Sequence, residues 1–315
     1  MSDTVKKATR EAYGEALVEL GKRNKNVIVL DADLSAATKT NSFKKEFPDR
    51  FFNTGIAEGN MIGVAAGLAT EGYTVFASSF AMFLAGRAFE QIRNSVGYTH
   101  LNVKIGATHA GISVGEDGAS HQCCEDIALM RSIPGMTIIN PADDVETMQA
   151  VLAAAEYEGP VYLRFGRLAL PRIFDEKKYK FEIGKGVEIV DGSDVTIVAT
   201  GLMVNEAIKA SEMLKAEGIS AKIINIHTIK PIDRDIIIDA AKKTGCIVTA
   251  EEHSIIGGLG SAVCEVLSES CPVPVVRLGV NDEFGQSGNA VELLKLYGLD
   301  AENIVKKAKL AINLK

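Results

Sequence analysis

Short apolar runs rich in β-branched residues alternate with longer amphipathic stretches along the whole chain. The runs predict strands at 27–30, 74–77, 103–106, 137–139, 161–165, 195–199, 221–226, 246–249 and 273–277. The stretches between them predict helices that include 8–20, 143–155, 205–217, 233–243, 260–269 and 287–297. Strands that are apolar at nearly every position are typical of parallel sheets buried on both faces. The pattern therefore predicts a doubly wound α/β fold with mainly parallel sheets.

The alternation is interrupted once, between Pro171 and Gly186. The segment PRIFDEKKYKFEIGKG is rich in charge and has no sustained helical or strand period, which is typical of a linker. At about 150 residues per domain, a chain of 315 residues also predicts two domains. The predicted division is a first domain at 1–171, a linker at 172–185 and a second domain at 186–315.

Composition and charge exclude several classes of function. The chain has 34 Lys and Arg against 41 Asp and Glu, and this net charge of −7 differs from the basic character of nucleic-acid-binding proteins. No apolar run approaches the roughly 18 residues of a membrane span, and the first residues lack the apolar core of a secretory signal. The five cysteines are irregularly spaced, so neither a disulfide framework nor a CxxC zinc site is expected. We expect a cytoplasmic protein that binds neither nucleic acid nor membranes.

Polar, glycine-rich segments follow several predicted strands of the first domain, at the edge of the sheet where parallel α/β proteins bind ligands. They are DADLS (31–35), NTGIAEGNM (53–61), SSFAMF (78–83) and ATHAGISVGEDGASHQ (107–122). Taken one at a time, these residues have ordinary structural interpretations. Glu58 could simply favour the start of a helix, and Phe80 and Phe83 could belong to the core.

The last of these segments carries a more specific signal. His109 and His121 enclose an acidic loop that contains Asp117, and this combination suits the recognition of hydroxyl or phosphate groups. In the second domain, the run at 257–261 fits neither common phosphate-loop pattern and favours a helix start or close packing. Glu251, Glu252 and His253 follow a predicted strand, but their spacing alone does not indicate a metal site.

Three of these segments, NTGIAEGNM, SSFAMF and ATHAGISVGEDGASHQ, resemble the carboxyl-terminal half of transketolase. That half comprises the pyrimidine-binding domain and the C-terminal domain of a thiamine-diphosphate enzyme. DVTIVATG (194–201) and IIGGLG (255–260) resemble the family's C-terminal domain, so the likeness covers nearly the whole chain. The resemblance implies thiamine diphosphate and Mg²⁺ as cofactors.

The resemblance also implies roles for single residues near the cofactor. Glu58 matches the glutamate that meets the aminopyrimidine ring and controls its protonation. Phe80 and Phe83 match aromatic residues that pack on that ring, and Asp33 matches an acidic residue near the cofactor. A further aromatic residue of the family falls on Gly86, so this wall of the pocket is expected to differ.

Substrate contacts follow in the same way from the resemblance. It implies substrate-binding roles for Arg10, His109, Asp117, His121 and Arg167. Asp117 and His121 would hold sugar hydroxyls, whereas His109 and the two arginines would bind the sugar phosphate, which suits the planar guanidinium. Together with Glu58, the two histidines are implied to be catalytic. The family's phosphate-binding serine falls on Ala37, which predicts one weaker phosphate contact.

Transketolases also carry an amino-terminal domain with a GDG…N motif that binds magnesium and the diphosphate. The only GDG-like element of this chain, at 116–118, belongs to the substrate loop. The resemblance therefore implies a split transketolase that transfers a two-carbon ketol unit between sugar phosphates. A separate N-terminal subunit would hold most of the diphosphate and metal, giving a heterotetramer of two copies of each subunit. This chain is expected to be inactive alone.

Three alternatives remain from the sequence. The beta subunit of a 2-oxoacid dehydrogenase decarboxylase has comparable length, but normally lacks the Asp-Gly-x-x-His run. Deoxyxylulose-5-phosphate synthase shares that run, but differs where this chain has Thr108-His109-Ala110-Gly111 and is normally one long chain. A degenerate binding or regulatory subunit would not need to keep the whole set of candidate site residues.

Overall fold

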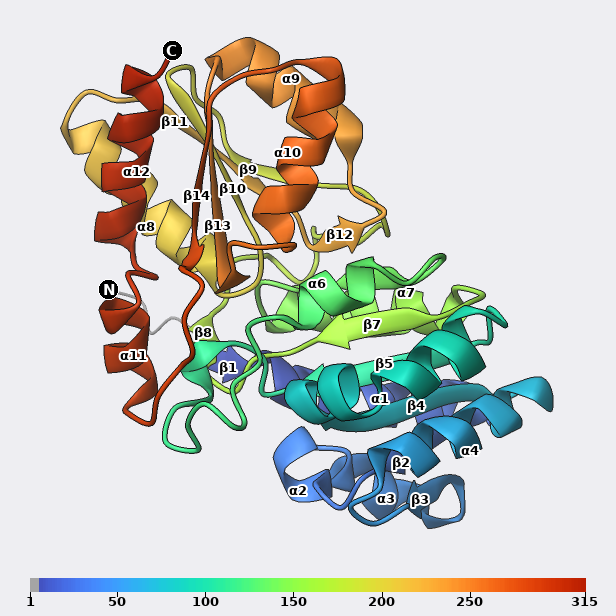
Figure 1. Ribbon diagram of the computed structural model, residues 1–315. Coiled ribbons are helices and arrows are strands. Elements are labelled where there is room, and N and C mark those ends of the chain that lie inside the picture. Colours follow the sequence, from blue (N-terminus) through green and yellow to red (C-terminus); the bar gives the residue numbers. More distant parts are fainter. Residues whose placement is uncertain (1–5) are drawn as a thin grey trace.

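Two mainly parallel sheets organise the chain into two bodies, one above the other in Figure 1. The structure, a computed structural model, describes residues 6–315. Residues 1–5, with which the predicted first domain begins, lie outside the described residues.

The first body is built on a seven-stranded sheet with the order β12-β6-β7-β5-β4-β2-β3. Its strands are β2 (Val27–Asp31), β3 (Phe51–Asn53), β4 (Thr74–Phe80), β5 (Val103–Thr108), β6 (Thr137–Ile139), β7 (Val161–Arg164) and β12 (Thr228–Lys230). Its helices are α1 (Thr9–Arg23), α2 (Ser35–Thr38), α3 (Asn41–Glu46), α4 (Glu58–Thr70), α5 (Phe89–Gln91), α6 (Asp126–Arg131) and α7 (Asp144–Glu156). All neighbouring strands are parallel except β12, which runs antiparallel to β6. Beside this sheet, β1 (Lys6–Ala8) pairs with β8 (Ala169–Pro171).

The second body has a five-stranded sheet with the order β14-β13-β10-β11-β9. Its strands are β9 (Val187–Val190), β10 (Val195–Ala199), β11 (Ala221–Asn225), β13 (Ile247–Ser254) and β14 (Val275–Val280). Its helices are α8 (Met203–Ala216), α9 (Arg234–Thr244), α10 (Leu259–Ser270), α11 (Ala290–Leu296) and α12 (Ala301–Asn313). Only β9 is antiparallel to its neighbour. In Figure 1, α8 and α12 cover one face of this sheet, and α9 and α10 cover the other.

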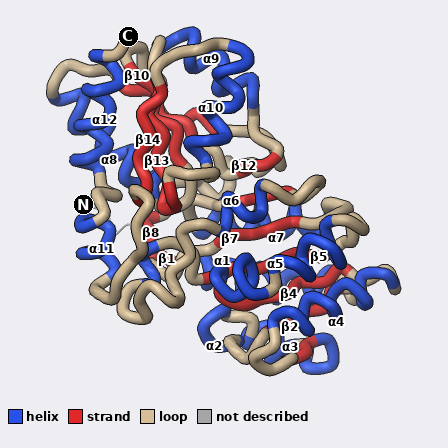
Figure 2. The backbone as a smooth tube through the Cα atoms, viewed as in Figure 1, coloured by secondary structure: helices blue, strands red, loops and turns tan. Residues whose placement is uncertain are grey.

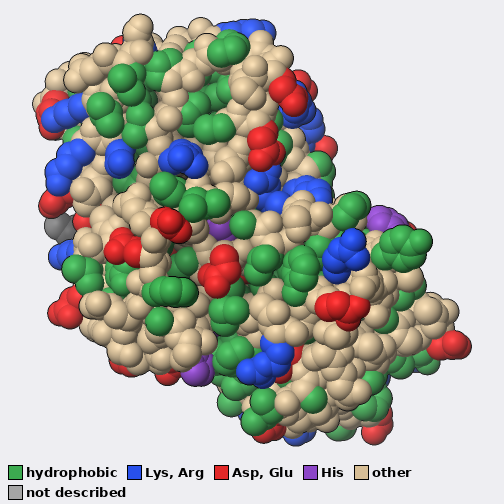
Figure 3. Space-filling model, viewed as in Figure 1, with side chains coloured by type: hydrophobic (Ala, Val, Ile, Leu, Met, Phe, Trp, Pro, Cys, Tyr) green, Lys and Arg blue, Asp and Glu red, His purple; other side chains and the backbone are tan. Residues whose placement is uncertain are grey.

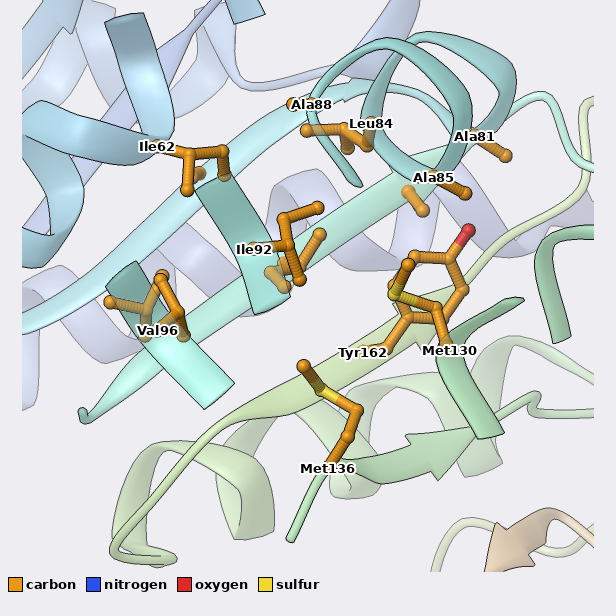
Figure 4. Close-up of a cluster of buried hydrophobic side chains, with 14 of the residues drawn as sticks. Ile62, Ala81, Leu84, Ala85, Ala88, Ile92, Val96, Met130, Met136 and Tyr162 are labelled. Carbon is orange, nitrogen blue, oxygen red and sulfur yellow. The ribbon is translucent and has the colours of Figure 1, made fainter. Parts of the chain in front are cut away.

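Helices cover both faces of each sheet because the strands are apolar at nearly every position. In β2, Ile28 and Leu30 belong to a cluster with residues of α4, whereas Val27 and Val29 pack with residues of α1 and α7 on the opposite face. Figure 4 shows the first cluster, with Ile62 of α4 among its side chains. This two-sided burial confirms the predicted doubly wound fold with mainly parallel sheets.

Some elements were not predicted. The stretch from Met82 to Gly97 is helical, and most of it lies in two π-helical segments, η2 (Met82–Arg87) and η3 (Ile92–Gly97). One such turn closes with the amide of Ala88 donating to the carbonyl of Phe83, at 3.2 Å. A π turn bonds residues five apart, so its apolar residues do not follow the 3.6-residue period. The prediction also lacked α12.

The strand β12 links the two bodies. It follows β11 of the second body in the chain, yet Thr228 pairs with Ile139 at the edge of the first sheet. The predicted linker at 172–185 contains no helix or strand and is fixed to α7. The amides of Ile173 and Phe174 donate to the Asp143 carboxylate, at 2.7 and 2.8 Å. These bonds connect the linker firmly to the first body.

One face of the molecule is seen in the space-filling view. Acidic and basic side chains are interspersed over the face in Figure 3. Among residues 6–315, no helix combines the length and the apolar character that a membrane span requires. All five cysteines are free thiols, and Cys123 and Cys246 are buried.

Candidate active site

Parallel pairing brings the polar segments of the first body to one edge of its sheet. Phe80, the last residue of β4, is the register partner of Thr108, the last residue of β5. His109 follows directly and therefore emerges beside Phe80. Asp31 at the end of β2 pairs in the same way with Ser78. The predicted assembly of these loops at the carboxyl ends of the strands is thus observed.

Aromatic side chains form a continuous strip at this edge. The ring of Phe80 stacks on the ring of His109, with centroids 3.8 Å apart, and on that of Phe83, with centroids 5.7 Å apart. His121 meets Phe83 edge to face at 5.3 Å. Phe80 and His109 are buried, whereas Phe83 is only half-buried. The exposed part of Phe83 offers an apolar surface on which a flat ring could pack.

Glu58 is the first residue of α4, and its carboxylate is buried next to this strip. Its residue is 1% exposed, and its Oε2 accepts a hydrogen bond from Arg87 at 2.8 Å. Arg87 is half exposed and also lies over the ring of Phe83, at 4.9 Å from the ring centroid. The hydroxyl of Ser79 is 3.5 Å from the other carboxylate oxygen. Glu58 is therefore held in place by one ion pair that itself borders the aromatic strip.

Sequence reasoning missed Arg87. It lies four residues after Phe83, so an ordinary helical pattern would have placed the two side chains on one face. The signal was missed because no helix was predicted after residues 78–83, where the structure has a π-helical turn. Gly86, in the same turn, packs against Met82. A Cβ at Gly86 would lie 2.2 Å from the Met82 methyl group, so Met82 occupies this part of the wall.

His109 is held in its neutral form. Burial, together with the charges of Arg10 and Arg167, lowers the pKa of His109 to about 3. Its Nε2 lies 3.0 Å from a guanidinium nitrogen of Arg10, and its Nδ1 lies 3.0 Å from the Thr108 hydroxyl. Because a guanidinium only donates, Nε2 must be the acceptor and Nδ1 carries the proton. His109 thus orients Arg10 rather than acting as a cation.

The two candidate phosphate-binding arginines line one cleft of about 270 Å³ between the bodies. Residues 289–291 of the second body form its opposite side. Arg10 donates to the backbone carbonyl of Ala37 at 3.0 Å, so the residue that replaces the family's serine still positions this arginine. Arg167 pairs with Glu116 at 2.7 Å. Both guanidinium groups retain donors that could bind an anion.

The remaining candidates lie outside this set of direct contacts. Asp33 is exposed and accepts a hydrogen bond at 2.8 Å from Asn53, which begins the loop that leads to Glu58. Asp117 is exposed in the loop between His109 and His121. The other seven predicted residues are therefore joined by ring contacts and ion pairs or line the common cleft. The carboxylates of Asp33 and Asp117 lie at the margin of this set.

The second body has no comparable site at its glycine run. Glu251 accepts hydrogen bonds from the amides of Leu259 and Gly260, at 2.7 and 2.8 Å, where α10 begins. A Cβ at Gly258 would lie 2.0 Å from a carboxylate oxygen of Glu251, so close packing requires glycine there. The expected helix start is confirmed. Among the described residues, no group of three or more His, Cys, Asp or Glu side chains could hold a metal ion.

Comparison with known proteins finds matches over nearly the whole chain. Residues 5–172 match the transketolase pyrimidine-binding domain, and residues 184–304 match the transketolase C-terminal domain. A protein of Methanocaldococcus jannaschii, described as a transketolase C-terminal section, is 58% identical over 96% of each chain. A 6-deoxy-6-sulfo-D-fructose transketolase subunit of a Clostridium species is 44% identical over 95% of this chain and 92% of its own.

A solved structure has nearly the same fold over the whole chain. It is described as a split gene transketolase in an inactive beta4 tetramer, and it is 56% identical to this chain. The TM-score is 0.92, with 98% of this chain and 99% of the other chain covered.

Proposed function

Because this chain belongs to the transketolase family, we propose that it is the C-terminal subunit of a split transketolase. It transfers a two-carbon ketol unit between sugar phosphates, with thiamine diphosphate and Mg²⁺ as cofactors. The observation that carries this proposal is the continuous set of contacts from Glu58 through Arg87, Phe83, Phe80 and His109 to Arg10. One end of this set suits an aminopyrimidine and the other suits a phosphate group.

The residues at the first end fit the pyrimidine half of the cofactor. Glu58 is a buried carboxyl group that can hold or release a proton at a ring nitrogen. Phe80 and Phe83 are nearly parallel, with 15° between their planes, and suit packing against a flat ring. When bound, thiamine diphosphate supplies the carbon nucleophile and the electron sink of the reaction. This chain contributes orientation, proton control at Glu58 and the exclusion of water by its aromatic wall.

The residues at the other end fit the sugar phosphate. Arg10 and Arg167 bind the phosphate, with Arg10 oriented by the neutral His109. His121 and Asp117 extend from the adjoining loop and contact the sugar hydroxyls. The ketose lies between the cofactor and these groups, with its phosphate in the cleft.

The exposed side of α4 offers a surface on which a partner subunit could pack. Its residues Asn60, Gly63, Val64 and Gly67 are exposed on one helical face, directly after the buried Glu58. Val64 is 40% exposed, and a Cβ at either glycine would meet no atom within 4 Å. Small residues allow another subunit to approach a helix closely. We propose that the N-terminal subunit covers this face, holds most of the diphosphate and Mg²⁺, and forms a cytoplasmic heterotetramer with two copies of each chain.

Replacing Arg10 with Met tests the role of the cleft in substrate binding. In the reconstituted enzyme, we expect the KM for xylulose 5-phosphate to rise by about 10- to 100-fold, because a charged hydrogen bond contributes about 1.5–3 kcal/mol. The KM for unphosphorylated xylulose should change by less than about threefold. Arg234→Met, at an exposed arginine on the second body, is the matched control. An equal rise in KM for both donors would contradict phosphate binding by Arg10.

A further inference from the structure

The loop that carries Asp117 and His121 contacts the second body as well as Arg167 and Phe83 of the first body. We call residues 111–121 the substrate loop. At its base, the amide of Gly111 donates to the carbonyl of Cys123 at 2.8 Å, so the loop leaves and returns at one point. In Figure 2, the connection between β5 and α6 runs beside the connection between β14 and α11. The second body can therefore determine the position of the loop.

Glu252, near the end of β13, reaches from the second body to the start of this loop. Its buried carboxylate accepts a hydrogen bond from the amide of Ser113 at 2.6 Å. Gly111 has a φ of +82°, and a Cβ there would lie 2.3 Å from the carboxyl carbon of Glu252. Only glycine adopts this backbone readily and leaves space for the carboxylate. The approach between Glu252 and the loop is thus close and specific.

Glu252 is itself fixed by a buried ion pair. Arg164 at the end of β7 donates to the backbone carbonyl of Glu252 at 2.9 Å. The same guanidinium pairs with Asp126 through bonds of 2.8 and 3.2 Å. Burial raises the pKa of Glu252 to about 7, with the charge of Arg164 opposing the shift. The ion pair of Arg164 and Asp126 therefore holds Glu252 in place at the contact between the two bodies.

Gln122 provides a second attachment at the other end of the loop. Its amide nitrogen donates to the carbonyls of Ile112 and Gln286, each at 3.0 Å. Gln286 belongs to the second body, and Gly285 beside it packs against the Gln122 side chain. The substrate-binding part of the loop, from Gly115 to His121, lies between these two attachments.

We propose that Glu252 of the second body is a positioning residue that sets the geometry of the substrate loop through its hydrogen bond to Ser113. This inference rests on the proposed function, since it assigns the loop to substrate binding. It gives the second body a role in recognising the sugar, although the residues named at the cofactor end, Glu58, Phe80 and Phe83, all belong to the first body.

The test combines amide exchange with kinetics. We expect Glu252→Ala to speed hydrogen–deuterium exchange of residues 111–121 in the full chain by about tenfold or more. In the reconstituted enzyme, kcat/KM for xylulose 5-phosphate should fall by about 10- to 100-fold. With hydroxypyruvate, which carries a ketol unit but no sugar hydroxyl chain, kcat/KM should stay within about threefold of the wild-type value. Glu252→Gln keeps an acceptor oxygen for the Ser113 amide and should recover most of the activity.

Glu251→Ala is the matched control. Glu251 is the neighbouring residue and is also buried, but its carboxylate faces the start of α10 instead of the loop. Its substitution should leave the ratio between the two donors unchanged. Should Glu252→Ala not fold, Ser113→Pro removes the amide donor from the loop side and should give the same changes.

Two results would overturn the proposal. One is an unchanged rate of amide exchange in the loop of Glu252→Ala or Ser113→Pro. The other is an equal loss of kcat/KM with both donors. Failure of the proposed function has a different signature. In that case the wild-type pair transfers no ketol unit, while the exchange experiment still decides whether Glu252 holds the loop.

Discussion

Replacing Glu58 with Gln should lower kcat of the reconstituted enzyme by about 100- to 10,000-fold, the range that a positioned proton-transfer group contributes. The amide of glutamine has the shape of the carboxyl group but cannot act as a proton donor or acceptor in catalysis as a carboxyl group does. Stability should change little, because Arg87 is 54% exposed and remains hydrated when it loses its partner. Single-turnover and steady-state rates with xylulose 5-phosphate measure the effect.

Glu71→Gln is the control for this substitution. Glu71 lies at the opposite end of the same helix, where it is exposed and follows Thr70. Its replacement should leave kcat within about twofold. Turnover near the wild-type rate with Glu58→Gln would show that Glu58 does not control a proton of the cofactor, and the assignment of the cofactor end would be wrong.

Replacing Asp126 with Asn should destabilise the chain by about 3–5 kcal/mol, because it leaves the buried Arg164 without its counter-charge. Asp126 and Arg164 are 0% and 3% exposed in their side chains. Asp126 also accepts a hydrogen bond from Tyr162 at 2.9 Å. Urea unfolding, followed by circular dichroism, measures the change.

An exposed pair serves as the comparison. Arg23 and Glu19 are one helical turn apart and 2.7 Å from each other, yet both are largely hydrated. Glu19→Gln should alter the free energy of unfolding by less than about 0.5 kcal/mol. If both substitutions had equally small effects, the network that supports Glu252 would not be a rigid element.

The fold was predictable because apolar runs of this kind can be buried only in sheets covered on both faces. Residues such as Ile28 and Val29 point to opposite faces, and each needs its own layer of helices. The π-helical turn at 82–87 was not predictable from a 3.6-residue period. Nor was β12, because its pairing with β6 depends on how two bodies meet and not on a local pattern.

The site was predictable where parallel pairing places it. Phe80 and His109 follow adjacent strands, so their meeting follows from the order of the sheet. The neutral state of His109 was not predictable, because it depends on burial and on Arg10, which lies 99 residues away in the chain. The contact of Glu252 with the substrate loop spans 139 residues and two bodies, and no motif marks it.

Ketol transfer by separated and mixed subunits tests the central claim most directly. The assay uses xylulose 5-phosphate and ribose 5-phosphate with thiamine diphosphate and Mg²⁺. It compares this chain alone, a candidate N-terminal subunit alone and their mixture, with assembly followed by light scattering. We predict activity only in the mixture, together with a complex of two copies of each chain. Activity of this chain alone, or an assembled complex that transfers no ketol unit, would contradict the account.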